Sequence, residues 1–313
     1  MRTLLFDHDV FGAHEVPPGH AEQQARYTAV DRALSSPEFA HLTRELAPKA
    51  DRTALLRAHG ERYVDDIFRL APTEGMVQLD ADTFMGPHSL DAALRGAGGA
   101  VAAIDAVFAG RADNAFVAAR PPGHHTVPDQ AMGFCVFNNA AIAARHARAV
   151  HGARRIAVVD FDVHHGNGTQ DIFFDDEDAF FASSHEWPQY PGTGRADEKG
   201  AFEQIHNAPL ATGEGSSAFR LAWGNDLLPA LSEFRPDVIV ISAGFDAHAA
   251  DPLGGLELLE ADFAWFTGQI MQIARDCCEG RVVSVLEGGY DLSALQTSVA
   301  AHVKTLASLD GPR

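Results

Sequence analysis

The chain has 313 residues, 46% of them hydrophobic, with 24 basic and 43 acidic side chains and a formal net charge of −19. A chain of this size buries one large core. Its negative charge repels nucleic acid and anionic membranes, so we expect neither as a partner. The same charge suits cationic substrates such as polyamines or lysine-bearing peptides, although an acidic soluble surface is the simpler explanation.

Targeting and disulfide signals are weak. An acidic cluster follows the short apolar run at residues 4–6, too early for the centre of a signal peptide. No apolar run approaches the ~20 residues that span a bilayer, so we expect a cytoplasmic protein.

The three cysteines, two of them adjacent, lack metal-ligand spacing and are too few for a disulfide framework. We expect core thiols.

Strand and helix patterns alternate along the chain without a break, repeat or low-complexity tract, which predicts one domain over residues 1–313. Alanine-rich amphipathic stretches predict helices, and short apolar runs predict buried strands. In chain order these are a helix at 89–109, a strand at 115–118, a helix at 138–151, strands at 156–159, 238–242 and 282–286, and a helix at 291–308. Such alternation is typical of an α/β protein with a parallel sheet.

The segment DFDVHHGNG at 160–168 directly follows one predicted strand. If the chain stays extended there, alternate side chains face the same way, so Asp160, Asp162 and His164 project together. Zinc binds carboxylate oxygen and imidazole nitrogen, and a catalytic zinc keeps positions open for water and substrate. An Asp-x-His pair alone is more often a cap or a solvated turn.

Three further strands end in residues of the same kind. His124 and His125 follow the strand at 115–118, Asp246 follows that at 238–242, and Tyr290 follows that at 282–286. Ligands of open α/β sheets sit beyond the carboxyl ends of strands, so Asp246 can complete a metal site. Taken singly, Asp246 fits a turn cap, Tyr290 a core ring and the histidine pair a satisfied loop.

Several blocks of the chain resemble the zinc-dependent histone deacetylase superfamily, whose bacterial members include acetylpolyamine amidohydrolases. They are HEVPPGHAEQQARY (14–27, the weakest), RPPGHH (120–125), GFCVFNNAAIAA (133–144), DFDVHHGNGTQDIF (160–173), YPGTG (190–194), SAGFDAHAADPLGG (242–255) and LEGGYDL (286–292). The resemblance implies the arginase–deacetylase fold. That fold has a parallel sheet of about eight strands, helices on both faces and an active site at one edge.

The residue types also predict a chemistry. Amide hydrolysis needs an activated water and a stabilised oxyanion, and zinc held by Asp162, His164 and Asp246 supplies both. Ferrous iron is compatible with the same ligands. Because two anionic ligands weaken the ion's effect on water, a base is needed, and His124 and His125 can transfer protons.

The resemblance implies a role for each further polar residue. His125 would be the general base and acid, while His124, paired with Asp160, would orient and support the site. Asn167 would stand behind His125, as in the class II branch, where an amide leaves the imidazole less basic than a carboxylate would. Tyr290 would donate its hydroxyl to the oxyanion.

Channel and ion-binding residues follow from the same resemblance. The substrate-binding set would be Phe134 and Tyr190 as channel walls, Gly133 beside them, Leu253 as a further wall and Asp82 at the rim. Asp82 is equally well explained as a turn residue. Leu253 weakens the polyamine alternative, because a polyamine-selective relative has an acidic residue there. A structural potassium site would use Asp160, Asp162, His164 and Ser183.

These observations predict a zinc-dependent amidohydrolase that removes acetyl or related acyl groups from lysine side chains or linear amines and releases acetate. An acetylpolyamine amidohydrolase is the alternative. A di-manganese ureohydrolase of the arginase type would use the run from Asp246 to Asp251, but the 160–164 segment lacks enough bridging carboxylates. A catalytically silent acyl-lysine-binding module would not need the intact polar set. The physiological substrate and the oligomeric state stay open.

Overall fold

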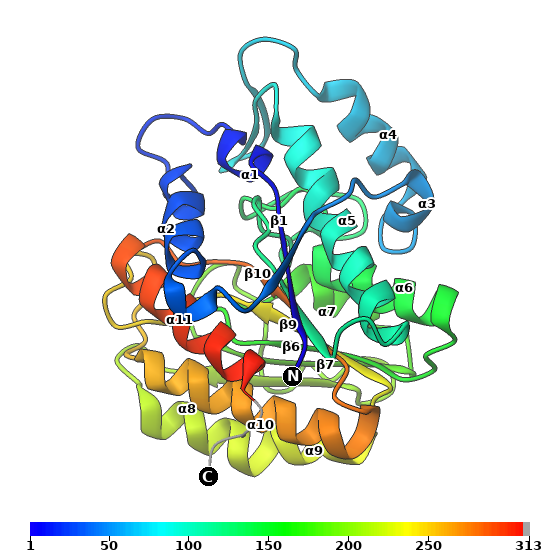
Figure 1. The fold of residues 1–313 in the computed structure, drawn as a ribbon, viewed down its shortest axis with the longest axis vertical. Coiled ribbons are helices and arrows are strands. Elements are labelled where there is room, and N and C mark those ends of the chain that lie inside the picture. The colour runs from blue at the N-terminus through cyan, green and yellow to red at the C-terminus, as the bar shows by residue number, and fades with distance from the viewer. Residues whose placement is uncertain (309–313) are drawn as a thin grey trace.

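The computed structural model describes residues 1–308 and contains an eight-stranded, wholly parallel sheet (Figure 1). The strand order is β2-β1-β5-β10-β9-β6-β7-β8. The strands are β1 (Thr3–Asp7), β2 (Thr43–Leu46), β5 (Asn114–Val117), β6 (Ile156–Asp160), β7 (Ala179–Glu186), β8 (Ile205–Leu210), β9 (Val238–Ala243) and β10 (Val282–Leu286). A separate antiparallel hairpin consists of β3 (Val77–Asp80) and β4 (Thr83–Met85).

Helices cover both faces of the sheet (Figure 1). They are α1 (Val10–Ala13), α2 (Ala25–Leu34), α3 (Arg52–Leu55), α4 (Glu61–Leu70), α5 (Ser89–Phe108), α6 (Asn139–His151), α7 (Asn167–Phe173), α8 (Ser216–Ala222), α9 (Leu228–Phe234), α10 (Glu260–Cys278) and α11 (Leu292–Ala307). Short 3₁₀ and π turns occupy Pro37–Phe39 and Trp223–Leu227. The predicted fold class is confirmed, and the strands and helices expected from the sequence lie within a residue or two of their predicted ends.

Two apolar clusters fill the space between the sheet and its helices. Strand side chains alternate between them: Val158 belongs to the cluster under α3–α7, and Val159 to the cluster under α2 and α8–α11. Both faces of the central strands are therefore buried, which explains their continuous apolar sequences. Cys135 and Cys278 are buried free thiols as expected, while Cys277 is half-buried. Within residues 1–308, no helix is long and apolar enough for a membrane span.

A buried ion network ties the N-terminal segment to the end of β5. The carboxylate of Glu22 is fully buried and accepts from Arg120 Nε at 2.6 Å and from Arg26 Nη1 at 2.9 Å. Although burial opposes ionisation, the charge of Arg120 and contact with His14 lower the pKa of Glu22 to about 2. Arg120 also donates to the carbonyl oxygens of Phe11, His14 and Glu22.

Replacing Arg120 with Met should lower the free energy of unfolding by roughly 3–5 kcal/mol, because Glu22 then loses one of its two buried guanidinium partners. Chemical denaturation at pH 7 measures the change. Arg69→Met is the matched control: Arg69 pairs with Asp66 at the surface, and its loss should cost under about 1 kcal/mol. Equal losses in the two variants would contradict the structural role of the network.

Candidate active site

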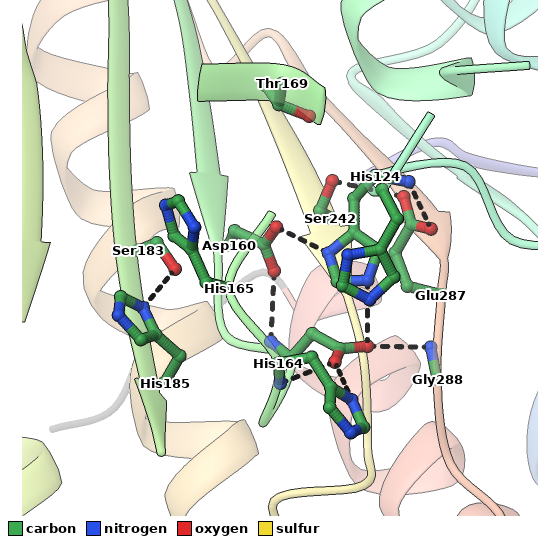
Figure 2. A network of polar contacts seen from close by, with 12 residues as sticks. His124, Asp160, His164, His165, Thr169, Ser183, His185, Ser242, Glu287 and Gly288 are labelled. Carbon is green, nitrogen blue, oxygen red and sulfur yellow. Dashed lines mark hydrogen bonds and ion pairs between the residues drawn. The ribbon is translucent and has the colours of Figure 1, made fainter. Parts of the chain in front are cut away.

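Four neighbouring strands in the middle of the sheet, β5, β10, β9 and β6, deliver polar residues to the same edge. Because the strands are parallel, the segments that follow them meet beyond their carboxyl ends. Figure 2 shows His124, Asp160, His164 and Glu287 converging there. The structure therefore brings the predicted strand-end residues together at one edge of the sheet.

Asp162, His164 and Asp246 form a compact, buried set of possible metal ligands. One atom from each lies within 4.8 Å of the others. His164 Nδ1 is 3.1 Å from Asp162 Oδ1 and 3.2 Å from Asp246 Oδ2. This carboxylate–imidazole set fits a transition metal such as zinc.

Charge in this set is unbalanced without a cation. Burial and the negative charge of Asp162 raise the pKa of Asp246 to about 7. Despite burial, hydrogen bonds to Asp162 and Asp246 raise the pKa of His164 to about 10. Both shifts favour the protonated side chains, whose protons balance part of the buried negative charge. A divalent cation could balance that charge instead, so a metal fits this set.

One expectation about this segment is wrong. Strand β6 ends at Asp160, and residues 161–164 bend out of the sheet instead of continuing in extended form. Backbone N–H groups are captured by carboxylates: Asp162 N donates to Asp160 Oδ1 at 3.1 Å, and His164 N to Asp162 Oδ1 at 2.9 Å. The ligands converge through these side-chain turns rather than through strand alternation.

His124 is held by carboxylates. Its Nδ1 donates to Asp160 Oδ2 at 2.9 Å, and its Nε2 lies 3.8 Å from Asp162 Oδ2. Although burial disfavours the charged ring, Asp162 and Asp160 raise the pKa of His124 well above its usual range. Both carboxylates thus favour the protonated ring of His124, which suits electrostatic support better than proton abstraction.

His125 has a different environment. Its Nδ1 donates to Asn167 Oδ1 at 2.8 Å, which leaves Nε2 free to accept a proton. Burial and the neighbouring His124 lower the pKa of His125 well below its usual range. Gly133 approaches this ring so closely that a Cβ there would collide with it. A neutral, oriented imidazole with a free nitrogen fits a general base.

Tyr290 stands beside the ligand set with its backbone fixed. Its N–H donates to Asp251 Oδ2 at 2.7 Å, and the guanidinium of Arg26 lies 4.9 Å from its ring centroid. Arg26 also donates to the carbonyl oxygens of Gly289 and Glu287.

Asp251 belongs to the run considered above for a ureohydrolase. One of its carboxylate oxygens accepts from Tyr290 N and the other from Leu253 N, so both oxygens are engaged by the backbone.

A cavity of about 250 Å³ opens onto these groups. It is lined by all five residues of the predicted substrate set, by three predicted site residues and by one that was not assigned a role: Asp82, Gly133, Phe134, Tyr190, Leu253, His125, His164, Tyr290 and Gln189. The Gln189 side chain accepts from Tyr190 N and donates to Leu253 O, so it links two walls.

Glu287 was missed as a site residue. It is fully buried at the end of β10, and its Oε2 accepts from Gly123 N at 2.6 Å and His124 N at 3.2 Å. Burial raises the pKa of Glu287 to about 7. The signal in the sequence was the one used for Asp160, a carboxylate directly after an apolar strand.

The predicted potassium residues Asp160 and Ser183 are paired across β6 and β7 and are both buried. Ser183 Oγ contacts His185 Nδ1 at 2.9 Å (Figure 2). Asp160 and Ser183 are thus neighbours at the same edge as the metal-ligand set. The potassium site itself stays a prediction.

Comparison with known proteins places this arrangement in a family. Residues 20–306 match the histone deacetylase domain. The chain belongs to the histone deacetylase family. It is 39% identical to histone deacetylase 14, chloroplastic, of Arabidopsis thaliana over 93% of this chain and 74% of that protein. It is 42% identical to a histone deacetylase-like amidohydrolase of Pseudomonas aeruginosa, over 87% and 73% of the two chains.

A solved structure shares the fold. The HD domain of HDA15 superposes with a TM-score of 0.92 at 34% identity, covering 97% of this chain and 88% of that one. This likeness confirms the arginase–deacetylase architecture expected from the sequence motifs. It also confirms the family resemblance that those motifs indicated.

Asn167→Asp should shift the acidic limb of the pH–rate profile upward by roughly one pH unit or more, because a carboxylate beside Nδ1 favours the protonated ring. Activity requires neutral His125, so turnover is then lost at a higher pH on acidification. The profile of kcat/KM measures the shift. An unchanged acidic limb, in a folded variant with normal metal content, would show that another group sets that limb.

Proposed function

We propose that the protein is a zinc-dependent amidohydrolase that removes acetyl or related acyl groups from lysine side chains or linear amines and releases acetate. The observation that carries this proposal is one cavity lined by a buried metal-ligand residue, a neutral histidine and a tyrosine, His164, His125 and Tyr290. The histone deacetylase domain and the deacetylase and amidohydrolase names of its relatives support the same reaction class.

Asp162, His164 and Asp246 would hold the metal, zinc or ferrous iron. When bound, such an ion supplies a Lewis acid that makes a water nucleophilic and polarises the amide carbonyl. The donors fit this role, because three buried ligands leave further positions open for water and substrate.

The remaining chemistry belongs to the protein side chains. His125 Nε2 takes the proton from the attacking water and returns it to the leaving amine. His124, whose protonated form Asp160 favours, stabilises negative charge nearby and holds the ring pair in place. Tyr290 donates its hydroxyl to the carbonyl oxygen as negative charge develops there.

The cavity selects a slender substrate. Phe134 and Tyr190 line it, and each ring meets a neighbour edge-on: Phe134 lies 5.8 Å from Tyr290 and Tyr190 lies 5.1 Å from His125 between centroids. A methylene chain would lie along these aromatic walls, while Asp82 can accept from an amide or ammonium group. Leu253 adds an apolar wall, which favours acyl-lysine over a polyamine with a second charge at that depth.

We also propose a structural potassium ion bound through Asp160, Asp162, His164 and Ser183. Its support is the pairing of Asp160 with Ser183 at the ends of β6 and β7. A monovalent cation there would offset part of the buried negative charge behind His124.

Removing the metal tests the proposal. A strong chelator should abolish hydrolysis of an acetyl-lysine peptide, and zinc should restore it, because the ligand set acts only with a cation bound. Turnover and elemental analysis are measured together, with N-acetylated putrescine, cadaverine and spermidine as parallel substrates. Full activity in verified metal-free protein would refute the assignment, and faster turnover of an acetylated polyamine would move it to the alternative.

Tyr290→Phe should lower kcat by about 100-fold or more, the usual scale for loss of one oxyanion donor. The ring, and with it the packing against Arg26 and Phe134, stays in place, so metal content should not change. Steady-state kinetics with elemental analysis checks both. Near-normal kcat in this variant would show that the hydroxyl has no part in the reaction.

A further inference from the structure

A second group of metal-ligating side chains lies outside the active site. Asp105 on α5 and His146 and His151 on α6 each offer one ligand atom, and these atoms lie within 4.8 Å of one another. Both imidazole Nε2 atoms are 2.7 Å from the same oxygen, Asp105 Oδ1. Two imidazoles converging on one carboxylate oxygen are a donor set typical of transition-metal sites.

The cluster lies at the edge of the sheet opposite the active site. Asp105 is in the last turn of α5, which ends at Phe108, and His151 is the last residue of α6. Both helices lead back toward the amino ends of β5 and β6. The last carbonyl groups of a helix carry partial negative charge, so two helix ends near the cluster favour a bound cation.

We propose that Asp105, His146 and His151 form a second site for a divalent transition metal ion such as Zn²⁺, Co²⁺ or Ni²⁺. Imidazole nitrogen favours these ions over Mg²⁺ and Ca²⁺. Ligand bonds of about 2.0–2.1 Å in tetrahedral geometry separate the donor atoms by roughly 3.4 Å. The 2.7 Å contacts therefore need to open by well under 1 Å.

The two rings are held in place before any ion arrives. His151 stacks on Phe108 with centroids 4.8 Å apart and an interplanar angle of 11°. His146 is buried in α6, and its ring centroid lies 5.7 Å from that of His151. The Asp105 side chain is 45% exposed, so an ion has access and water can complete its coordination.

The competing explanation is a plain hydrogen-bonded cluster in which both Nε2 atoms carry protons and donate to Asp105. Arg57 favours that state, because its Nη1 lies 2.8 Å from His146 Nδ1 and can only donate. A metal on Nε2 moves the ring proton to Nδ1, which then faces the guanidinium. Arg57, which is half-buried, must move away from His146 when the ion binds. Because this contact is lost, Arg57 should lower the affinity of the site for the ion.

Equilibrium dialysis against Co²⁺ or Zn²⁺ alone, read by elemental analysis, tests the proposal, and turnover is measured separately. The native protein should bind two ions per chain. His151→Gln and Asp105→Asn should bind one and keep the native hydrolytic rate, whereas Asp246→Asn should lose the other ion and keep this one. Failure of the proposed deacetylation is thus distinguishable from failure of the second site.

Two further variants sharpen the result. Arg57→Met should tighten the second ion by roughly ten-fold, the scale on which outer partners of ligands act. His41→Gln is the control, because His41 is exposed and outside the cluster. One ion per chain in both the native protein and Arg57→Met would overturn the proposal, as would a second ion that survives His151→Gln in a folded variant.

Discussion

Buried negative charge at the centre of the sheet is the constraint on which the rest of the site depends. Asp160, Asp162, Asp246 and Glu287 are all fully buried at the ends of β6, β9 and β10. Isolated buried carboxylates are very costly, so each must be met by hydrogen-bond donors or by positive charge. Backbone N–H groups of Val163, Gly288 and Gly123 supply part of this. A cation at Asp162 and Asp246 would supply what the backbone does not.

The same charge gives two adjacent histidines different properties. His124 faces Asp160 and Asp162, which favour its protonated form, whereas His125 is buried against the amide of Asn167. Their pKa values therefore move in opposite directions, up for His124 and down for His125. When the pKa values of two groups in one site are shifted apart, one group can carry charge while the other transfers protons. Sequence adjacency alone does not distinguish these roles.

What the sequence predicted well were features that depend on local pattern. The strand ends followed from the apolar runs, and the five residues expected to bind substrate line one cavity. The bend after Asp160 was not predicted, because apolar periodicity does not report a carboxylate that captures its neighbour's N–H. The hydrogen bond by which Arg26 holds the backbone beside Tyr290 was not predicted, because its acceptor, Gly289 O, lies 263 residues away in the chain. Such pairs become visible only when the chain is folded.

The two carboxylate–histidine groups differ in burial, and therefore in the chemistry that they can support. At Asp162, His164 and Asp246 every ligand is buried, and His125 and Tyr290 stand beside the same cavity. At Asp105, His146 and His151 two of the three ligands are partly exposed, and Arg57 occupies the outer nitrogen of one ring. Water weakens electrostatic stabilisation there, and neither a buried base nor an oxyanion donor faces it among the contacts described for residues 1–308. Similar donors would therefore support catalysis in one place and ion binding alone in the other.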